Sequence, residues 1–360
     1  MHSEITKDSF KGKSFYVGID YHKKNWMVTI LGEQYEHKTM SQDADPEQLA
    51  TYLKRNFPGG SYHAVYEAGF GGFVACRKLN ELGVDCWVIH PADVPTSGKE
   101  RLQKTDRSDS RKLARSLRSR EFEPVHLPDA TLEADRALVR QRYRVMKDVS
   151  RTKNRIKSLL SQFGIAIPDS FTCYQTRHWS AAYLGWLKAV DTEQAVVRTV
   201  LDNYLQIGEH QRSDLLYLNR QVRALSVCER YRENYLLLLS IPGIGVMTAM
   251  AFLVQVGDIT RFKTLDDLCN YIGLVPAMYG SGEKMQVGKM IKRGRKELKI
   301  MLIEASWESI RKDPAMMSKF DELGKRMHKN KAIVRIARKM LSRMRFVLCH
   351  GKPYEKSIVK

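Results

Sequence analysis

The sequence has no segment of the kind that directs a protein to a membrane or out of the cell. Its first fifteen residues, MHSEITKDSFKGKSF, contain no apolar stretch typical of a signal peptide. The longest apolar run, 236–257, is interrupted by Pro242, Gly243 and Gly245. Such an interruption favours two helices joined by a turn over a membrane span. We therefore expect a cytoplasmic protein without a membrane partner.

Cysteine is also sparse, with 6 among 360 residues. The cysteines are scattered, and none forms a C-x-x-C pair or a Cys/His cluster with zinc spacing. A disulfide framework and a short-spaced zinc site are thereby excluded, and reduced thiols are expected. Internal repeats and low-complexity tracts are missing as well.

Acidic residues are too few to balance the basic ones. The 60 Lys and Arg residues exceed the 40 Asp and Glu residues, which gives a formal net charge of +20 and a pI near 9.6. This surplus indicates a polyanionic partner, nucleic acid before membrane. A basic protein without such a partner is the alternative. The length predicts two or three domains, and 43% apolar residues suffice for real cores.

The first 90 residues alternate between strand and helix patterns. SFYVGID, NWMVTIL and EQYEHKTM read as three strands with tight connections, followed by the amphipathic helix PEQLATYLKRNF. YHAVYEAG, GGFVACRKLNELG and VDCWVIHP then read as strand, helix and strand. The pattern predicts an α/β sheet. Three antiparallel strands followed by a β-α-β unit is the order of the ribonuclease-H-like (RuvC-like) fold, which is an analogy of fold.

A helical middle region is predicted next. Residues 100–120 read as a loop that enters a basic helix, and 132–163 form a long helical pattern in which Leu138, Val145 and Leu159 recur by heptads. Apolar residues also recur in a 3-4-3 spacing over 215–225. The two helices predict either a coiled-coil dimerisation arm or a pair packed on its own domain. We expect domains at 1–128, 129–235 and 236–360, the last mainly α-helical.

Four carboxylates stand at positions where catalytic acids occur. Asp20 and Glu67 each end a predicted strand, and Asp106 and Asp109 lie three residues apart, on one face of a helix. Oxygen ligands of this kind suit Mg²⁺, and two such ions can clamp the attacking and leaving oxygens of a phosphodiester. Structural alternatives exist for each residue: Asp106 as a helix N-cap, Asp109 as a first-turn acid, and Glu67 as the partner of a lysine.

The stretch YGSGEKMQVGKMIKRGRK places Ser281 between two glycines, in a predicted loop. A serine hydroxyl needs a base or a metal to attack a phosphate, and the neighbouring residues supply neither. They do supply cations that would hold a phosphate, namely Lys284, Lys289, Lys292, Arg293, Arg295 and Lys296. A plain turn serine is the alternative.

Two further segments are candidates for phosphate contact. IPGIGVMTA, 241–249, has the form of a helix-hairpin-helix turn in which the amides of Gly243 and Gly245 can point at a phosphate. A glycine-rich turn between core helices is the alternative. Residues 325–345 hold many Lys and Arg and no acid, and Arg335, Arg338 and Lys339 are our candidates within them.

These motifs together resemble the DEDD transposases of the IS110 insertion-sequence family. The resemblance rests on GID, YEAG and KTDRSD, and on IPGIGVMTA followed by YIGLVPAMYGSGEKMQVGKMIKRGRKELKIMLIEAS, over residues 14–355. It implies a RuvC-like domain that binds Mg²⁺ through Asp20, Glu67, Asp106 and Asp109. It also implies that Ser281 attacks DNA and forms a covalent phosphoserine intermediate.

The resemblance further implies the partners. A structured bridge RNA would pair with both donor and target DNA. The chain would assemble as dimers that pair into tetramers, with a coiled coil between its two catalytic domains. The active site would be composite between subunits, and the enzyme would work at the prokaryotic nucleoid. Two other functions stay open on the residues alone: a two-metal nuclease such as a junction resolvase, and a non-catalytic nucleic-acid-binding protein.

Overall fold

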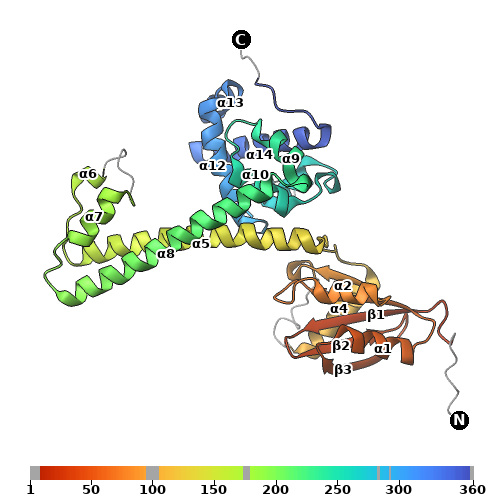
Figure 1. The fold of residues 1–360 in the computed structure, drawn as a ribbon. Helices are drawn as coiled ribbons and strands as arrows, with labels where there is room; N and C mark the ends of the chain where they lie inside the picture. The colour runs from red at the N-terminus through yellow and green to blue at the C-terminus, as the bar shows by residue number, and fades with distance from the viewer. Residues whose placement is uncertain (1–8, 95–104, 173–178, 282–283, 292, 357–360) are drawn as a thin grey trace. The chain divides into compact units, whose positions relative to one another are not determined.

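A computed structural model describes residues 9–94, 105–172, 179–281, 284–291 and 293–356 (Figure 1). The chain divides into two compact units, Met1–Pro128 and Asp129–Lys360. The first unit is a mixed α/β domain, and the second is mainly helical. The predicted boundary near residue 235 lies inside the second unit and stays a prediction.

The N-terminal unit contains one five-stranded sheet. Its elements are β1 (Ser14–Tyr21), β2 (Asn25–Leu31), β3 (Glu36–Asp43), α1 (Pro46–Asn56), β4 (Ser61–Glu67), α2 (Val74–Glu81), β5 (Asp85–Ile89), the 3₁₀ turn η1 (Pro91–Asp93) and α4 (Asp106–Ser119). The strand order is β3-β2-β1-β4-β5. β1 pairs antiparallel with β2 and parallel with β4, and β5 is parallel to β4. The predicted α/β sheet is confirmed, and its strand order is compatible with a ribonuclease-H-like fold.

Helices cover both faces of this sheet because both faces of its central strands are apolar. Val17 and Ile19 of β1 share one core with Leu53 of α1 and Leu79 of α2. On the other face Val65 of β4 packs against Leu113 and Leu117 of α4. Each fully buried leucine stabilises the unit by roughly 1.5–3 kcal/mol. Two elements distant in sequence, β1 and α4, are thereby fixed against each other.

The C-terminal unit begins with two long helices and a short helical cap. Its elements are α5 (Ala130–Gln162), α6 (Asp169–Thr172), α7 (Ala181–Ala189), α8 (Ala195–Ser226), α9 (Glu229–Leu239), α10 (Val246–Val256), η2 (Ile259–Arg261), α11 (Leu265–Ile272), β6 (Pro276–Ser281), β7 (Lys284–Met290), α12 (Lys296–Lys312), α13 (Pro314–Gly324) and α14 (Lys329–His350).

Helices α5 and α8 run antiparallel along each other (Figure 1). Arg142 donates a hydrogen bond to Asn219, and Thr152, ten residues further along α5, donates to Gln211, which lies earlier in α8. This register is that of an antiparallel pair. The 33 residues of α5 span roughly 50 Å. The two helices predicted from heptad spacing therefore pack on each other within one chain. Whether they also join a second chain stays a prediction.

A helical core completes the unit. The 236–257 run is divided, as predicted, into α9 and α10 by a turn at 240–245. No helix in the described part of the chain is long and apolar enough to cross a membrane. The five cysteines within the described ranges are free thiols. Residues 325–345 form much of α14, whose Ile336, Met340 and Met344 are buried in the core that it shares with α10 and α12.

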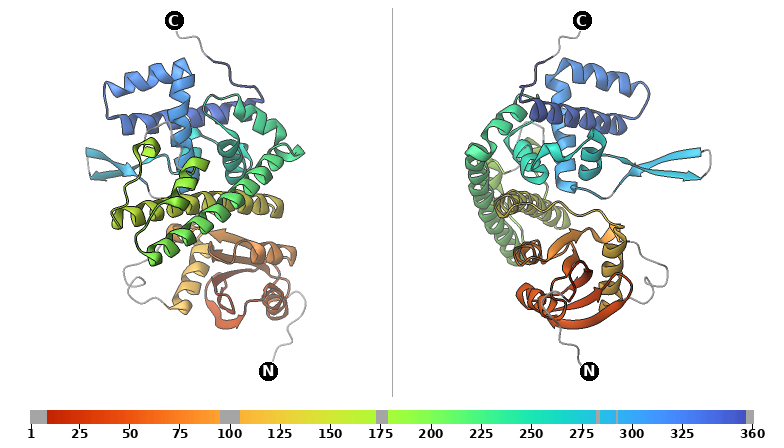
Figure 2. Two further views of the ribbon diagram at one scale, coloured as in Figure 1. Left: turned by 60° about the vertical axis from the view of Figure 1, so that its left-hand side comes forward. Right: turned by 90° about the vertical axis from the view of Figure 1, so that its right-hand side faces the viewer.

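The loop predicted around Ser281 is wrong. The segment is a two-stranded antiparallel hairpin of β6 and β7, in which Gly280 pairs with Met285 and Ser281 with Lys284. Figure 2 shows this hairpin (cyan) extending away from the helices of its own unit. Main-chain pairing joins the two strands over Pro276–Ser281 and Lys284–Met290.

Candidate metal centre and the Ser281 hairpin

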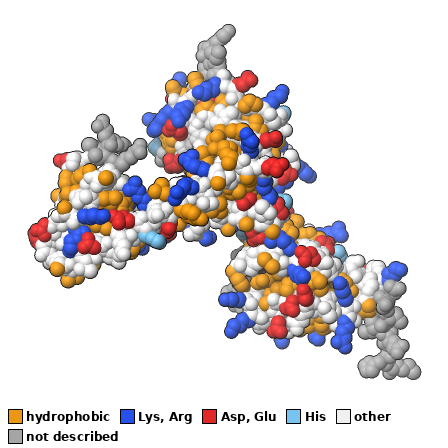
Figure 3. Space-filling view, in the orientation of Figure 1, with side chains coloured by type: hydrophobic (Ala, Val, Ile, Leu, Met, Phe, Trp, Pro, Cys, Tyr) orange, Lys and Arg blue, Asp and Glu red, His pale blue; other side chains and the backbone are white. Residues whose placement is uncertain are grey.

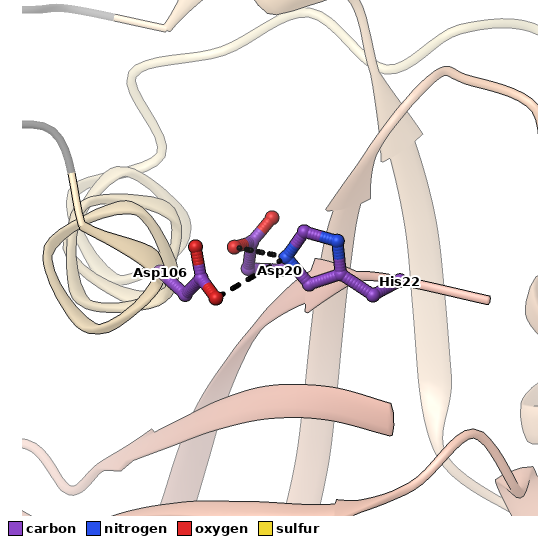
Figure 4. A group of neighbouring side chains, drawn as sticks. All are labelled: Asp20, His22 and Asp106. Atoms are coloured by element: carbon purple, nitrogen blue, oxygen red, sulfur yellow. Dashed lines mark hydrogen bonds and ion pairs between the residues drawn. The ribbon is translucent and has the colours of Figure 1, made fainter. Parts of the chain in front are cut away.

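Asp20, His22 and Asp106 meet at one end of the sheet. The His22 Nε2 atom lies 3.1 Å from Asp20 Oδ2 and 3.5 Å from Asp106 Oδ2. One potential ligand atom from each residue falls within 4.8 Å of the other two. Figure 4 shows both carboxylates, one on β1 and the other on α4, directed at the same ring nitrogen of His22. The convergence predicted for Asp20 and Asp106 is therefore present in the structure.

The first turn of α4 is fixed by its N-cap. Thr105 is the N-cap, its hydroxyl accepts a hydrogen bond from the amide of Ser108, and Ser108 bonds back to the amide of Thr105. Asp106 is thus the first helical residue and not the N-cap that the structural alternative supposed. Both Asp106 and Asp109 lie in the first turn, where the helix dipole favours negative charge.

The other two predicted carboxylates lie close to this group in the fold. Ile19 of β1 and Tyr66 of β4 are partners in the parallel ladder. Asp20 follows Ile19, and Glu67 follows Tyr66, so the two acids lie on adjacent strand ends. The strand end at Glu67 is held by the Ala68 amide, which donates to the carbonyl of Ile89. Asp109 is near enough to Asp20 for its charge to act on that residue. Of the four acids, Asp20 and Asp106 share the group with His22, and Asp109 acts on Asp20 through its charge. Glu67 lies on the neighbouring strand end and is not part of the group.

The electrostatics of Asp20 are those of a crowded acid. Burial raises the pKa of Asp20, and the charges of Asp106 and Asp109 raise it further, while His22 opposes them. The Asp20 side chain is 22% exposed, and that of Asp106 is 61% exposed. Carboxylates brought together at a partly buried position are costly unless a cation joins them. The group is thus suited to a divalent ion.

The donor set fits such an ion. Carboxylate oxygens are ligands for Mg²⁺ and Mn²⁺, and an imidazole nitrogen is a better ligand for Mn²⁺ than for Mg²⁺. His22 is not among the residues predicted from the sequence. It lies two residues after Asp20, so it falls on the same side of an extended chain, and that spacing was the available signal.

Ser281 is the last residue of β6, in the C-terminal unit. The base of its hairpin is held by two glycines with left-handed backbones, Gly273 with φ +87° and Gly294 with φ +107°. A Cβ atom on Gly273 would lie 2.3 Å from the carbonyl oxygen of Arg293, and a Cβ on Gly294 would lie 2.7 Å from the Gly273 nitrogen. The chain that enters the hairpin thus touches the chain that leaves it.

The predicted phosphate contacts have different surroundings. Lys289, Arg293 and Lys296 are exposed, as are Arg335 and Lys339 on α14. Arg338 instead pairs with Asp266 and donates to the carbonyl of Leu274, which ties α14 to α11. The side chain of Lys284 and all of Lys292 lie outside the described residues.

The two glycines of the 241–249 turn also differ. A Cβ on Gly243 would lie 2.4 Å from the carbonyl oxygen of Ala305, so this glycine packs against α12. Gly245 is exposed and precedes α10. Figure 3 shows basic and acidic side chains interspersed on the visible face, so no single patch there holds the net charge.

Comparison with known proteins indicates the family to which this site belongs. Residues 17–165 match the model of the IS110-type DEDD transposase domain, described as "Transposase". Residues 235–321 match the model described as "Transposase IS116/IS110/IS902 family". The chain belongs to the IS110 family of transposases.

Individual relatives agree with this assignment. The chain is 28% identical over 357 residues to a putative transposase, y4rJ, of Sinorhizobium fredii, covering 91% of this chain and 90% of that one. It is 26% identical over 250 residues to the transposase for insertion sequence element IS1533 of Leptospira borgpetersenii, covering 68% and 70%. A pilin gene-inverting protein of Moraxella lacunata is 28% identical over 263 residues, covering 71% and 69%.

Proposed function

We propose that the chain cleaves and exchanges DNA strands with Ser281 as nucleophile and with a divalent ion held by the carboxylates of the N-terminal unit. One observation carries the proposal: Asp20 and Asp106, which are 86 residues apart in the sequence, converge with His22 into a group that fits a metal ion. The family assignment supports DNA as the substrate.

Asp20, Glu67, Asp106 and Asp109 are the proposed ligands, and we propose Mg²⁺ as the ion in the cell. When bound, such an ion polarises a phosphoryl oxygen and lowers the pKa of an attacking hydroxyl. The protein's part is to hold Asp20 and Glu67 at the strand ends and Asp106 and Asp109 in the first turn of α4. Burial and the two neighbouring acids raise the pKa of Asp20, so a bound cation would favour its charged form. His22 can add a nitrogen ligand to the same ion.

The covalent step transfers one phosphoryl group. The hydroxyl oxygen of Ser281 bonds to the scissile phosphorus, and one phosphorus–oxygen bond of the DNA backbone breaks. The proton lost by Ser281 is matched by the proton that the leaving oxygen takes up. The products are a phosphoserine ester and a free hydroxyl end of DNA. Attack on this ester by the hydroxyl end of another DNA strand releases Ser281 and joins the two DNA strands.

The exposed cations Lys289, Arg293 and Lys296 would contact the DNA backbone near the serine, and Arg335 and Lys339 would do so on α14. We further propose a bridge RNA that pairs with donor and target DNA, and an assembly of dimers into tetramers. In such an assembly the serine of one subunit would meet the metal group of another. This activity places the protein with DNA in a prokaryotic cytoplasm.

A covalent-adduct assay tests the proposal. Purified protein is incubated with the end DNA of its element, the flanking transcript and Mg²⁺, and a denaturing gel is run beside Ser281→Ala and Asp106→Asn. We expect a DNA–protein band that both variants lose. Cleaved DNA without an adduct, equally abundant in Ser281→Ala, would refute the serine mechanism and favour hydrolysis by a RuvC-like nuclease.

A further inference from the structure

A cavity of about 360 Å³ lies in the C-terminal unit where α5, α8, α10 and the start of α12 meet. Its wall carries five cationic side chains, Arg140, Arg142, Arg144, Arg295 and Lys296. Among the residues that line it, Glu297 is the one carboxylate. The cavity thus gathers positive charge from α5 and α12, although the surrounding core is apolar.

Neutral groups hold several of these cations in place. Arg140 donates to Gln255 Oε1 at 3.0 Å, and Arg142 donates to Asn219 Oδ1 at 2.9 Å. The Arg295 guanidinium stacks over the ring of Tyr271, with 4.9 Å from its central carbon to the ring centroid. These partners orient the guanidinium groups without cancelling their charge.

The excess of positive charge has a cost within the protein itself. Burial lowers the pKa of Arg140 and the neighbouring charge of Arg295 lowers it further, while the carboxylate of Glu297 opposes this shift in part. Like charges held together at a half-buried position destabilise the fold unless an anion joins them. A phosphate group is the anion that a fork of arginines matches best, because each guanidinium can donate two parallel hydrogen bonds.

The location indicates where such a phosphate would come from. Gly294 at the cavity wall stands four positions after Met290, the end of β7, so at most about 14 Å of chain joins them. A nucleic-acid strand that contacts the base of the hairpin would therefore lie near the cavity. Met247 and Leu298 add an apolar wall against which a sugar or base can pack.

We propose that this cavity binds a backbone phosphate of a nucleic-acid strand through Arg140, Arg144 and Arg295. The inference rests on the proposed function only in taking nucleic acid as the ligand. It adds residues of α5 to the nucleic-acid-binding surface.

The salt dependence of binding tests the inference. Full-length protein is titrated into a fluorescent single-stranded DNA of 30 nucleotides, and into RNA of the same sequence, at several salt concentrations. Removing one phosphate-binding cation lowers the slope of log affinity against log salt by about 0.7 on single strands. The double variant Arg144→Gln/Arg295→Gln should therefore lower the slope by about 1.4 with at least one of the two strands.

A matched variant separates the cavity from general charge. Arg151→Gln/Arg155→Gln removes two exposed cations from the same helix, outside the cavity, and should leave the slope nearly unchanged. Arg144→Lys should retain most of the wild-type slope because its charge remains. Thermal melting of each variant shows whether it is folded.

The outcomes are distinct. The inference would be wrong if the salt slope of Arg144→Gln/Arg295→Gln equalled that of the wild type. It would also be wrong if both double variants lost the same amount of slope. Either result would leave the proposed function in place. If the wild-type protein bound neither the DNA nor the RNA, both the cavity inference and the proposed function would be refuted. A loss confined to the cavity variant on DNA or on RNA supports the inference and identifies the strand.

Discussion

The main chain of Ser110 lies so close to Gly18 that a Cβ atom on Gly18 would be 2.0 Å from the Ser110 carbonyl oxygen. The helix α4 thus rests with its backbone directly on β1. The Ser110 hydroxyl also meets the hydroxyl of Thr29 on β2, at 2.8 Å. This close packing sets the distance between Asp106 on the helix and Asp20 on the strand.

Gly18→Ala should consequently damage both the fold and the metal group. The added methyl group meets backbone atoms that cannot rotate away, so α4 must shift, at a cost of about 1–3 kcal/mol in the free energy of unfolding. Urea unfolding measures the loss, and Mn²⁺ titration should show weaker binding. Gly69→Ala is the control, because its Cβ would have its nearest neighbour at 3.9 Å. Equal metal affinity in Gly18→Ala would contradict the positioning role.

Asp20→Asn should stabilise the protein when no metal is present. Burial, with the charges of Asp106 and Asp109, raises the pKa of Asp20 in the folded state. A raised pKa means that the folded state favours the protonated carboxyl. That stabilisation is complete below the pKa of the unfolded chain and is lost as the pH rises through the folded pKa. At neutral pH the ionised carboxylate of Asp20 therefore lowers the stability of the fold. The uncharged amide of Asn at this position in the variant does not.

Thermal unfolding in chelator and in excess Mn²⁺ measures this effect. In chelator, Asp20→Asn should melt above the wild type at pH 7 and lose that advantage at acidic pH. With Mn²⁺, the wild type should gain stability by mass action, while the variant gains much less. A variant that melts below the wild type in chelator would show that Asp20 stabilises the fold by other contacts.

Much of the N-terminal unit follows from local sequence. Short strand-like segments with tight connections predicted β1, β2 and β3, an amphipathic pattern predicted α1, and a basic stretch predicted α4. The convergence of Asp20 with Asp106 was also predictable, because each acid ends or begins an element. His22 was not predicted, although its position two residues after Asp20 was a signal that could have pointed to it.

The Ser281 hairpin shows where sequence reasoning stops. Each of the two strands contains a glycine, and β7 also contains two lysines, so the sequence pattern predicted a loop. Tertiary contacts at Gly273 and Gly294 bring the two ends of the hairpin together. The cationic cavity was likewise hidden, because Arg140 and Arg295 are 155 positions apart in the sequence.

Gly273→Ala should disturb the hairpin that carries Ser281. The substitution combines a left-handed backbone with a Cβ only 2.3 Å from the Arg293 carbonyl oxygen. Gly351→Ala isolates the backbone contribution, because Gly351 also has a positive φ but no atom within 4 Å of its Cβ. The backbone alone should cost about 1 kcal/mol, and Gly273→Ala should cost more.

The functional readout is the covalent adduct. Gly273→Ala should reduce adduct formation and leave Mn²⁺ affinity at the wild-type value, since the metal group belongs to the N-terminal unit. Gly351→Ala should form the adduct normally. If Gly273→Ala formed as much adduct as the wild type, the close approach at this glycine would not position the serine strand.

Asp313 joins three parts of the C-terminal unit through a fully buried carboxylate. Its Oδ2 atom accepts hydrogen bonds from Arg343 Nη1 at 2.7 Å and from the Tyr354 hydroxyl at 2.8 Å. Its Oδ1 atom accepts from the amides of Ala315 and Met316 and so caps α13. The side chain is 0% exposed, and that of Arg343 is 13% exposed.

Asp313→Ala should therefore be strongly destabilising, by about 3–5 kcal/mol, because it leaves the guanidinium of Arg343 buried without its charge partner and removes the cap of α13. Amide hydrogen exchange of α13 and α14 measures the loss locally, which avoids assuming that both units unfold together. The exposed pair of Glu308 and Lys312 on α12 supplies the control, since Glu308→Ala removes a solvated carboxylate and should leave exchange nearly unchanged. Equal protection of α13 in both variants would mean that packing by Met316 and Leu323, rather than the Asp313 bonds, holds that helix in place.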